Sequence, residues 1–100
     1  MAMEIEFDDD TLDKLYTDGS FTGGFSAQIV KQFRFVMQLI VSATDERDLY
    51  QFKSRRFEKL DGKRKHQHSL RLNKQWRLIV EIRGKVPNKS IAIVEITDYH

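Results

Sequence analysis

The chain has 100 residues, of which 40% are hydrophobic, 11% aromatic and 32% charged, which suits one domain with a modest core and argues against a disordered polymer. Its net charge is +2 and no apolar run approaches the ~18 residues of a membrane span, while the absence of Cys excludes disulfides, thiolate nucleophiles and Cys-ligated zinc. The first residues lack the basic start and apolar middle of a signal peptide, so we expect a cytoplasmic protein with one domain over residues 1–100.

A strand and a helix are predicted at the start of the chain. Residues 4–7 are expected to form the strand. The three aspartates at positions 8–10 offer an N-cap and negative first-turn charge to a helix that carries Leu12 and Leu15. The Asp-Gly-Ser sequence at residues 18–20 then ends this helix.

The clearest helix is predicted over residues 27–41. Ser26 is its expected N-cap, and Phe25 and Val30 have the spacing of a hydrophobic staple. Apolar side chains recur with the 3.6-residue period on one face, namely Ile29, Phe33, Met37, Ile40 and Val41. Thr44 is expected to cap the short turn that follows.

The second half of the chain changes to the two-residue period of β-strands. Strands are expected over residues 67–72, 76–83 and 90–97, with a hairpin loop at 73–75 and a turn around the only proline at 84–88. These elements predict an α+β domain in which an N-terminal strand and two to three helices pack on one face of an antiparallel sheet.

The predicted hairpin sets two arginines against each other. Strand alternation places His68 and Leu70 on the core side and Arg71 on the other side, and a three-residue loop sets Arg71 opposite Arg77. Like charges directly opposite each other destabilise a sheet, so the pairing favours either a well-solvated face or a bound anion. Arginine suits an anion because its guanidinium grips phosphate through two parallel hydrogen bonds.

Charge is divided unevenly along the chain. Residues 1–50 carry ten acidic and four basic side chains, whereas residues 51–100 carry five acidic and thirteen basic ones. Residues 53–77 alone hold ten Lys or Arg against Glu58 and Asp61. Such a block is typical of a surface that binds phosphate polyanions, although a solvated, self-repelling face has the same composition.

Motifs of several enzyme and DNA-binding classes are missing from the sequence. It contains no P-loop, Rossmann glycine pattern, H-E-x-x-H or G-x-S-x-G, and its basic block falls on predicted strands and loops rather than on a helix-turn-helix. His66 and His68 lack a third ligand at a sensible spacing, so we expect neither a metal nor a cofactor. With His100 they are the side chains that titrate near neutral pH and could transfer protons.

Two blocks of sequence resemble a known family. The first, residues 60–82, contains G-x-R followed by H-S-L-R-L-N-K-Q-W-R-L. The second, residues 94–100, reads V-E-I-T-D-Y-H. Together with the turn at residues 44–49, they resemble the HigB-type toxins of the RelE/ParE superfamily, which end with the same V-E-I-x-D-Y-H run.

The resemblance implies a fold, an activity and partners. The fold would be a small α+β domain with helices against a curved antiparallel sheet. The activity would be that of a metal-independent endoribonuclease that enters the ribosomal A site, cuts mRNA during translation and inhibits growth. The partner would be a HigA-type antitoxin with a helix-turn-helix domain, through which alone the toxin would reach operator DNA.

The resemblance also implies site residues. Arg77 would stabilise the transition state, Arg64 is the arginine of G-x-R, and Tyr99 and His100 are the terminal pair, with His100 a candidate for proton transfer. His68 is a further proton-transfer candidate. Contacts to ribosomal RNA are expected mainly through charge, from Lys53, Arg55, Arg56, Lys59, Lys63, Lys65, Arg71 and Lys74.

Two positions depart from the family pattern. Asp61 stands where several relatives have a catalytic Lys, and His66 stands where many have Gly. A carboxylate cannot neutralise phosphate charge, so the proton-transfer roles stay open, with Lys59, Lys63 or His68 able to compensate. Two alternatives to the nuclease therefore remain: a non-enzymatic ParE-like poison of a target such as gyrase, and a catalytically weak toxin that binds RNA or the ribosome.

Overall fold

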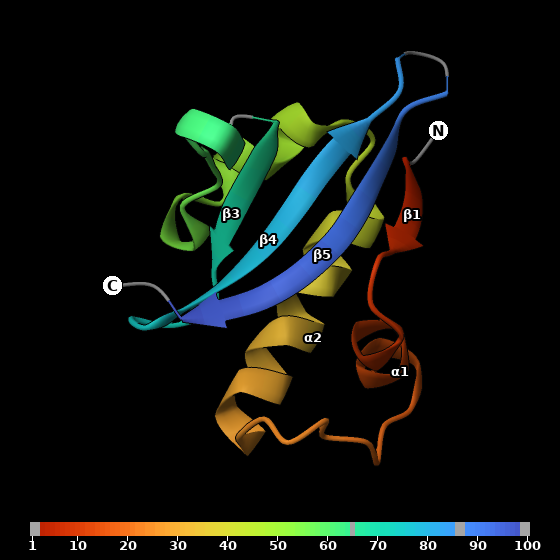
Figure 1. Ribbon diagram of the computed structural model, residues 1–100, viewed down its shortest axis with the longest axis vertical. Coiled ribbons are helices and arrows are strands. Elements are labelled where there is room, and N and C mark those ends of the chain that lie inside the picture. Colours follow the sequence, from red (N-terminus) through yellow and green to blue (C-terminus); the bar gives the residue numbers. More distant parts are fainter. Residues whose placement is uncertain (1–2, 65, 86–87, 99–100) are drawn as a thin grey trace.

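A sheet covered by helices on one face is the framework of the protein (Figure 1). The computed structural model describes residues 3–64, 66–85 and 88–98. In chain order the elements are β1 (Glu4–Phe7), α1 (Asp10–Thr17), α2 (Ala27–Ser42), the 3₁₀ helices η1 (Glu46–Gln51) and η2 (Lys53–Arg55), β2 (Glu58–Lys59), the 3₁₀ helix η3 (Gly62–Arg64), β3 (Gln67–Arg71), β4 (Trp76–Arg83) and β5 (Ser90–Asp98). No helix among these residues is long and apolar enough to cross a membrane.

The sheet has the strand order β1-β5-β4-β3-β2. Strands β3, β4 and β5 are antiparallel, as predicted, and β2 adds a further antiparallel pair. Strand β1, which was expected to pack on the sheet with the helices, instead joins its edge parallel to β5, so the sheet is mixed. The two-residue period of a strand fixes which side chains share a face and does not fix the neighbour or its direction. The short strand β2 was not predicted, because two residues are too few to show a period.

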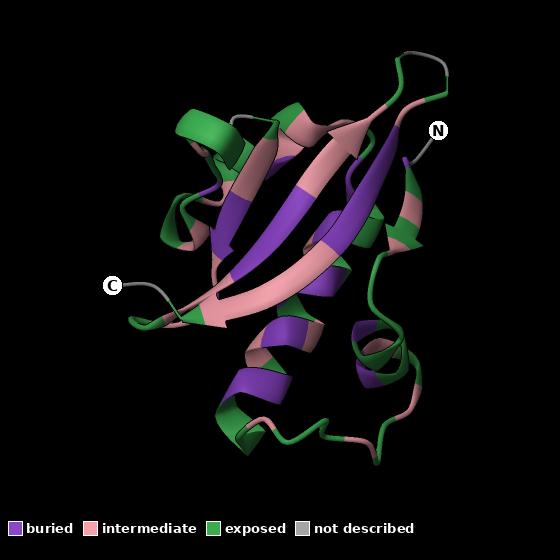
Figure 2. Cartoon of the chain, viewed as in Figure 1, coloured by how far each residue is buried: buried purple, intermediate pink, exposed green. Residues whose placement is uncertain are grey.

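Capping residues start both α-helices where the sequence predicts. The Asp9 carboxylate accepts from the backbone N–H of Thr11 at 2.7 Å, and Ser26 Oγ accepts from that of Ile29 at 3.2 Å. The buried face of α2 contains Val36 in addition to the predicted residues, whereas Val41 is 38% exposed and does not belong to it. The core therefore lies between the sheet and one stripe of α2 (Figure 2).

The turn after α2 is capped by Asp45 and not by Thr44 as predicted. Asp45 immediately precedes η1, and its carboxylate accepts from the backbone N–H of Arg47 at 3.2 Å. The N–H and hydroxyl of Thr44 instead donate to the Asp48 carboxylate, each at 2.9 Å. A carboxylate directly before the first helical residue reaches the free N–H groups, which Thr44 is one residue too early to do.

A β-bulge in β5 determines which of its side chains face the helices. Ile79 pairs with Glu95 and Val80 pairs with Ile93, which leaves Val94 as the extra residue. Ile93 and Ile96 therefore both lie on the helix side despite their odd spacing, and Glu95 is turned to the other side. We call that other side, formed by Gln67, Ser69, Arg71, Arg77, Ile79, Glu81, Arg83, Glu95 and Thr97, the outer face.

Candidate functional site

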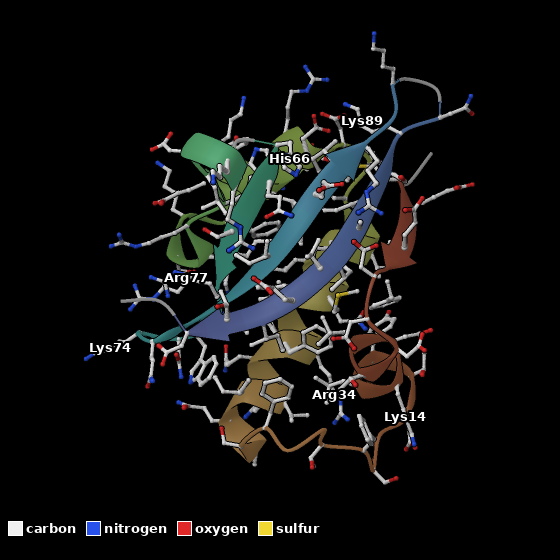
Figure 3. The ribbon with its side chains drawn as sticks, viewed as in Figure 1. Lys14, Arg34, His66, Lys74, Arg77 and Lys89 are labelled. Atoms are coloured by element: carbon white, nitrogen blue, oxygen red, sulfur yellow. The ribbon has the colours of Figure 1, made fainter. Side chains whose placement is uncertain are left out.

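Two arginines converge at one corner of the outer face. Arg71 pairs directly with Arg77 across the β3–β4 hairpin, as predicted from the loop length. Arg77 Nη1 donates to the carbonyl of Asn73 at 2.9 Å and to that of Trp76 at 3.3 Å, while Arg71 Nε donates to the same Asn73 carbonyl at 3.3 Å. Two guanidinium groups thus share one neutral acceptor at the sheet corner where Figure 3 labels Arg77 and Lys74.

Asn73 builds the turn that presents this acceptor. Its Oδ1 accepts from the backbone N–H groups of Gln75 and Trp76, both at 2.8 Å, which is the side-chain-to-backbone pattern of an Asx turn. The N–H of Leu72 donates to the Trp76 carbonyl at 2.9 Å and closes the hairpin. Sequence reasoning predicted the loop but missed the Asn73 carbonyl as a shared acceptor, because a backbone group has no sequence signal.

Arg64 reaches the same face from η3. Its Nε donates to Gln67 Oε1 at 2.9 Å, and its Nη2 lies 2.7 Å from Glu95 Oε1. Glu95 pairs with Ile79, which is two residues from Arg77 along β4. Same-face neighbours on a strand are about 6.6 Å apart, so Arg64 is held near Arg77 on one surface. No local pattern in the sequence marks Glu95, because its partner Arg64 is distant in the chain.

At the opposite end of the outer face, three carboxylates surround one arginine. Arg83 contacts Asp8 at 2.7 Å, Glu6 at 3.1 Å and Glu81 at 2.5 Å. These hydrogen bonds from Arg83 hold the pKa values of Asp8 and Glu81 below their usual range, so both stay ionised. The outer face therefore carries Arg71 and Arg77 at the β3–β4 hairpin and an excess of carboxylates near β1.

The two strand histidines point in different directions. His66 Nε2 lies 3.1 Å from Glu81 Oε1 on the outer face. His68 is on the helix side, where its ring stacks on Phe57 with centroids 4.6 Å apart and an interplanar angle of 7°. Burial and the charge of Lys59 lower the pKa of His68, and its Nδ1 is buried without a hydrogen-bond partner in the described part of the chain. The structure does not bring His68 together with Arg64 and Arg77.

The remaining expected RNA-binding residues fall into three groups. Exposed positions on η2, β2, η3 and the loops hold Lys53, Arg56, Lys59, Lys63 and Lys74. Arg55 is half-buried and donates to the carbonyls of Arg71 and Leu72 at 3.3 and 3.4 Å. Lys65 lies outside the described residues, as do the catalytic candidates Tyr99 and His100. Across the three described ranges, no three His, Asp or Glu side chains come together as metal ligands.

Comparison with known proteins assigns the chain to a class of small toxins. The solved structure of a YoeB/ParE toxin from Agrobacterium tumefaciens has the same fold, with a TM-score of 0.61 at 12% sequence identity, covering 98% of this chain and 100% of that chain. A family model described as "RelE-like toxin of type II toxin-antitoxin system HigB" matches residues 5–100. The chain therefore belongs to the HigB-like family of RelE-like type II toxins. None of the curated proteins matches it.

Proposed function

We propose that this toxin is a ribosome-dependent endoribonuclease that cuts mRNA in the A site without a bound metal and thereby stops translation and growth. The observation that carries the proposal is the pairing of Arg71 with Arg77, both bound to the Asn73 carbonyl. Facing guanidinium groups repel each other, and a phosphate placed between them would replace that repulsion by attraction. Arg64 on the same face adds a third cation.

The reaction uses an internal nucleophile of RNA. A base takes the proton of a 2′-hydroxyl, the 2′-oxygen attacks the adjacent phosphorus, and the bond to the 5′-oxygen breaks while an acid protonates that oxygen. The products are a 2′,3′-cyclic phosphate and a 5′-hydroxyl. Negative charge on the phosphorane rises in the transition state. Arg77 and Arg64 would therefore bind the transition state more tightly than the ground state, which would lower the barrier.

Proton transfer is assigned to the residues that the family pattern offers. His100 is the proposed proton donor or acceptor, with Tyr99 beside it. His68 is left out of this set because it stacks on Phe57 on the helix side of the sheet. Asp61, at the position of a lysine in several relatives, is exposed directly before Gly62, whose φ of +67° suits glycine.

Membership in a type II toxin family implies an antitoxin partner. We propose a HigA-type antitoxin with a helix-turn-helix domain, which alone would contact operator DNA. The toxin would act in the cytoplasm, where it would dock on the ribosome through its exposed lysines and arginines. The acidic surface from Asp8 to Asp13 would face away from RNA, because like charges repel.

Mapping of mRNA cuts by primer extension on purified translating ribosomes tests the proposal. Wild-type toxin is expected to cut mRNA only when a ribosome holds it. When the assembled ribosome–mRNA complexes are first cross-linked, later chelation of divalent cations should leave the cut unchanged. A toxin that inhibits DNA supercoiling by gyrase and leaves mRNA intact would be the non-enzymatic poison instead. Ribosome binding without cleavage would identify a binding toxin and reject the nuclease.

A further inference from the structure

An aromatic side chain stands exposed on α2 at a position that the helix does not use for the core. Phe35 is 53% exposed, whereas Phe33 and Met37 are fully buried. The guanidinium carbon of Arg55, from η2, lies 4.9 Å from the centre of the Phe35 ring. A single exposed ring is ordinary on a protein surface, so its surroundings decide whether it has a role.

The β3–β4 hairpin fixes Arg55 over this ring. Both of its hydrogen bonds, to the carbonyls of Arg71 and Leu72, come from Nη1, so Nη2 and Nε remain for another acceptor within the described part of the chain. None of the ion pairs among the described residues includes Arg55. A half-buried cation with neutral partners is stabilised further when an anion approaches it.

Arg34 shows what a purely structural arginine looks like in this protein. It also donates to carbonyls, but it uses Nε and Nη2 for three of them, on Leu15, Asp18 and Phe21. These bonds tie α2 to the end of α1 (Figure 3). Arg55 makes fewer bonds, from one nitrogen, and lies against an exposed ring.

The surroundings of Phe35 are cationic or polar. Helix α2, η2 and the hairpin loop 73–75 contain Lys and Arg but no Asp or Glu. On α2 the exposed neighbours of Phe35 are Lys31 and Gln38, and the apolar neighbour Leu39 is half-buried, so the apolar surface beside the ring is narrow. Among the described residues, Asp98 is the carboxylate that contacts this loop, where it accepts from Gln75 at 3.0 Å.

We propose that Phe35 and Arg55 form a platform for one unpaired nucleotide of RNA, whose base stacks on the ring and whose phosphate binds Arg55. This inference rests on the proposed ribonuclease function and deepens it. Arg55 is bonded to the backbone of Arg71, and Arg71 faces Arg77, so one RNA strand that crosses the hairpin would contact the platform and the reacting corner. Stacking accepts any base, so the platform would add affinity and little sequence preference.

The test measures binding to ribosomes programmed with an mRNA whose A-site codon carries 2′-O-methyl groups, because this RNA cannot be cut. Phe35→Ala is expected to raise the Kd about tenfold or more, the loss of one stacked base. Phe35→Tyr should bind like the wild type, and Phe35→Leu should bind as weakly as Phe35→Ala, since leucine keeps apolar area but has no ring. Val41→Ala, at another exposed apolar position of α2, is the matched control and should bind normally.

A second readout uses cleavable mRNA. Phe35→Ala should raise KM and leave kcat unchanged, because the platform binds ground state and transition state alike. Equal Kd values for wild type and Phe35→Ala would overturn the platform, as would recovery of binding by leucine. Weaker antitoxin binding with unchanged ribosome binding would identify a protein-docking position instead. If the wild type binds programmed ribosomes but leaves unmodified mRNA intact, the nuclease proposal fails while the Kd comparison still decides the platform.

Discussion

Arg71 and Arg77 lie directly opposite each other in the β3–β4 hairpin and donate to one carbonyl, that of Asn73. A fold has little reason to place two guanidinium groups in this way, since opposed like charges cost stability. The shared carbonyl offsets part of that cost and fixes both groups at the corner of the outer face. In the nuclease proposed above, this pair is the anion site, and its shared hydrogen bond would orient the cations before RNA binds.

Replacement of Arg77 is expected to abolish toxicity. The loss of one transition-state donor costs about 100- to 1,000-fold in rate for comparable sites, so Arg77→Ala should cut mRNA at least 100-fold more slowly. Arg77→Lys should recover little, because an ammonium cannot reproduce the planar fork. Growth after induction and cleavage on ribosomes measure both effects.

Lys74→Ala is the matched control for Arg77, because Lys74 is exposed in the adjacent loop and should matter only for RNA affinity. Its cleavage rate should stay within a few-fold of the wild type. Full toxicity of a soluble, normally folded Arg77→Ala protein would contradict the nuclease assignment.

Glu95 should act as a positioning residue for Arg64. Glu95→Ala removes the 2.7 Å contact and is expected to lower kcat roughly tenfold, since small displacements of a catalytic group are costly. Glu95→Gln keeps an acceptor oxygen and should lose less. Glu4→Gln, an exposed carboxamide substitution on β1, is the control and should have no effect. A faster Glu95→Ala enzyme would mean that this carboxylate competes with RNA for Arg64.

Introduction of a cation at position 61 should raise activity. Asp61 is exposed and repels phosphate, so Asp61→Lys is expected to increase the cleavage rate several-fold without loss of stability. Asp61→Asn removes the repulsion only, and comparison of the two variants separates the removal of a negative charge from the gain of a positive one. Unchanged cleavage in both would show that position 61 lies away from the RNA.

The acidic surface should be needed for stability and not for cleavage. Asp9→Ala removes the α1 cap and is expected to cost about 1 kcal/mol, which lowers Tm by roughly 4–8 °C. Cleavage per folded molecule on free ribosomes should remain within a few-fold. Calorimetry and primer extension on the same preparation check both statements, and a hundredfold loss of cleavage in a folded variant would place RNA on this side.

His68 should make the protein less stable in mild acid. Burial and Lys59 lower the pKa of His68 below its usual 6.5, so the unfolded chain takes up a proton that the folded chain refuses. The free energy of unfolding should therefore fall as pH drops through 6.5 and below, toward the lower folded pKa.

His68→Phe tests this statement, because phenylalanine keeps the stack on Phe57 and has no buried nitrogen. The variant should be more stable by about 1 kcal/mol and should lose most of the slope between pH 5 and pH 7. Urea unfolding across this range measures the slope. His66→Gln is the control, and loss of the slope in that variant instead would assign it to the pair of His66 with Glu81.

Local signals in the sequence predicted most of the framework. Caps at Asp9 and Ser26, the period of α2 and the three-residue loop that opposes Arg71 to Arg77 depend on neighbours in the chain, so they can be read without a structure. The parallel β1–β5 pair, the bulge at Val94 and the contact of Arg64 with Glu95 join distant segments. No period or cap encodes such contacts, which are decided by packing of the whole chain. The exposed position of Phe35 was not singled out, because a helical period identifies the buried stripe and gives no information on the role of exposed side chains.

Strand β5 lies between β1 and β4 although it is the last strand in chain order. Its register with β1 joins Glu4 to Ser90, and it carries the carboxylate that holds Arg64. Contacts this far apart in sequence form late in folding. During synthesis of the chain, β1 lacks its neighbour β5 and Arg64 lacks its contact with Glu95 until residues 90–98 have emerged. The edge of the sheet and the ion pair of Arg64 with Glu95 are thus completed together by one strand, β5.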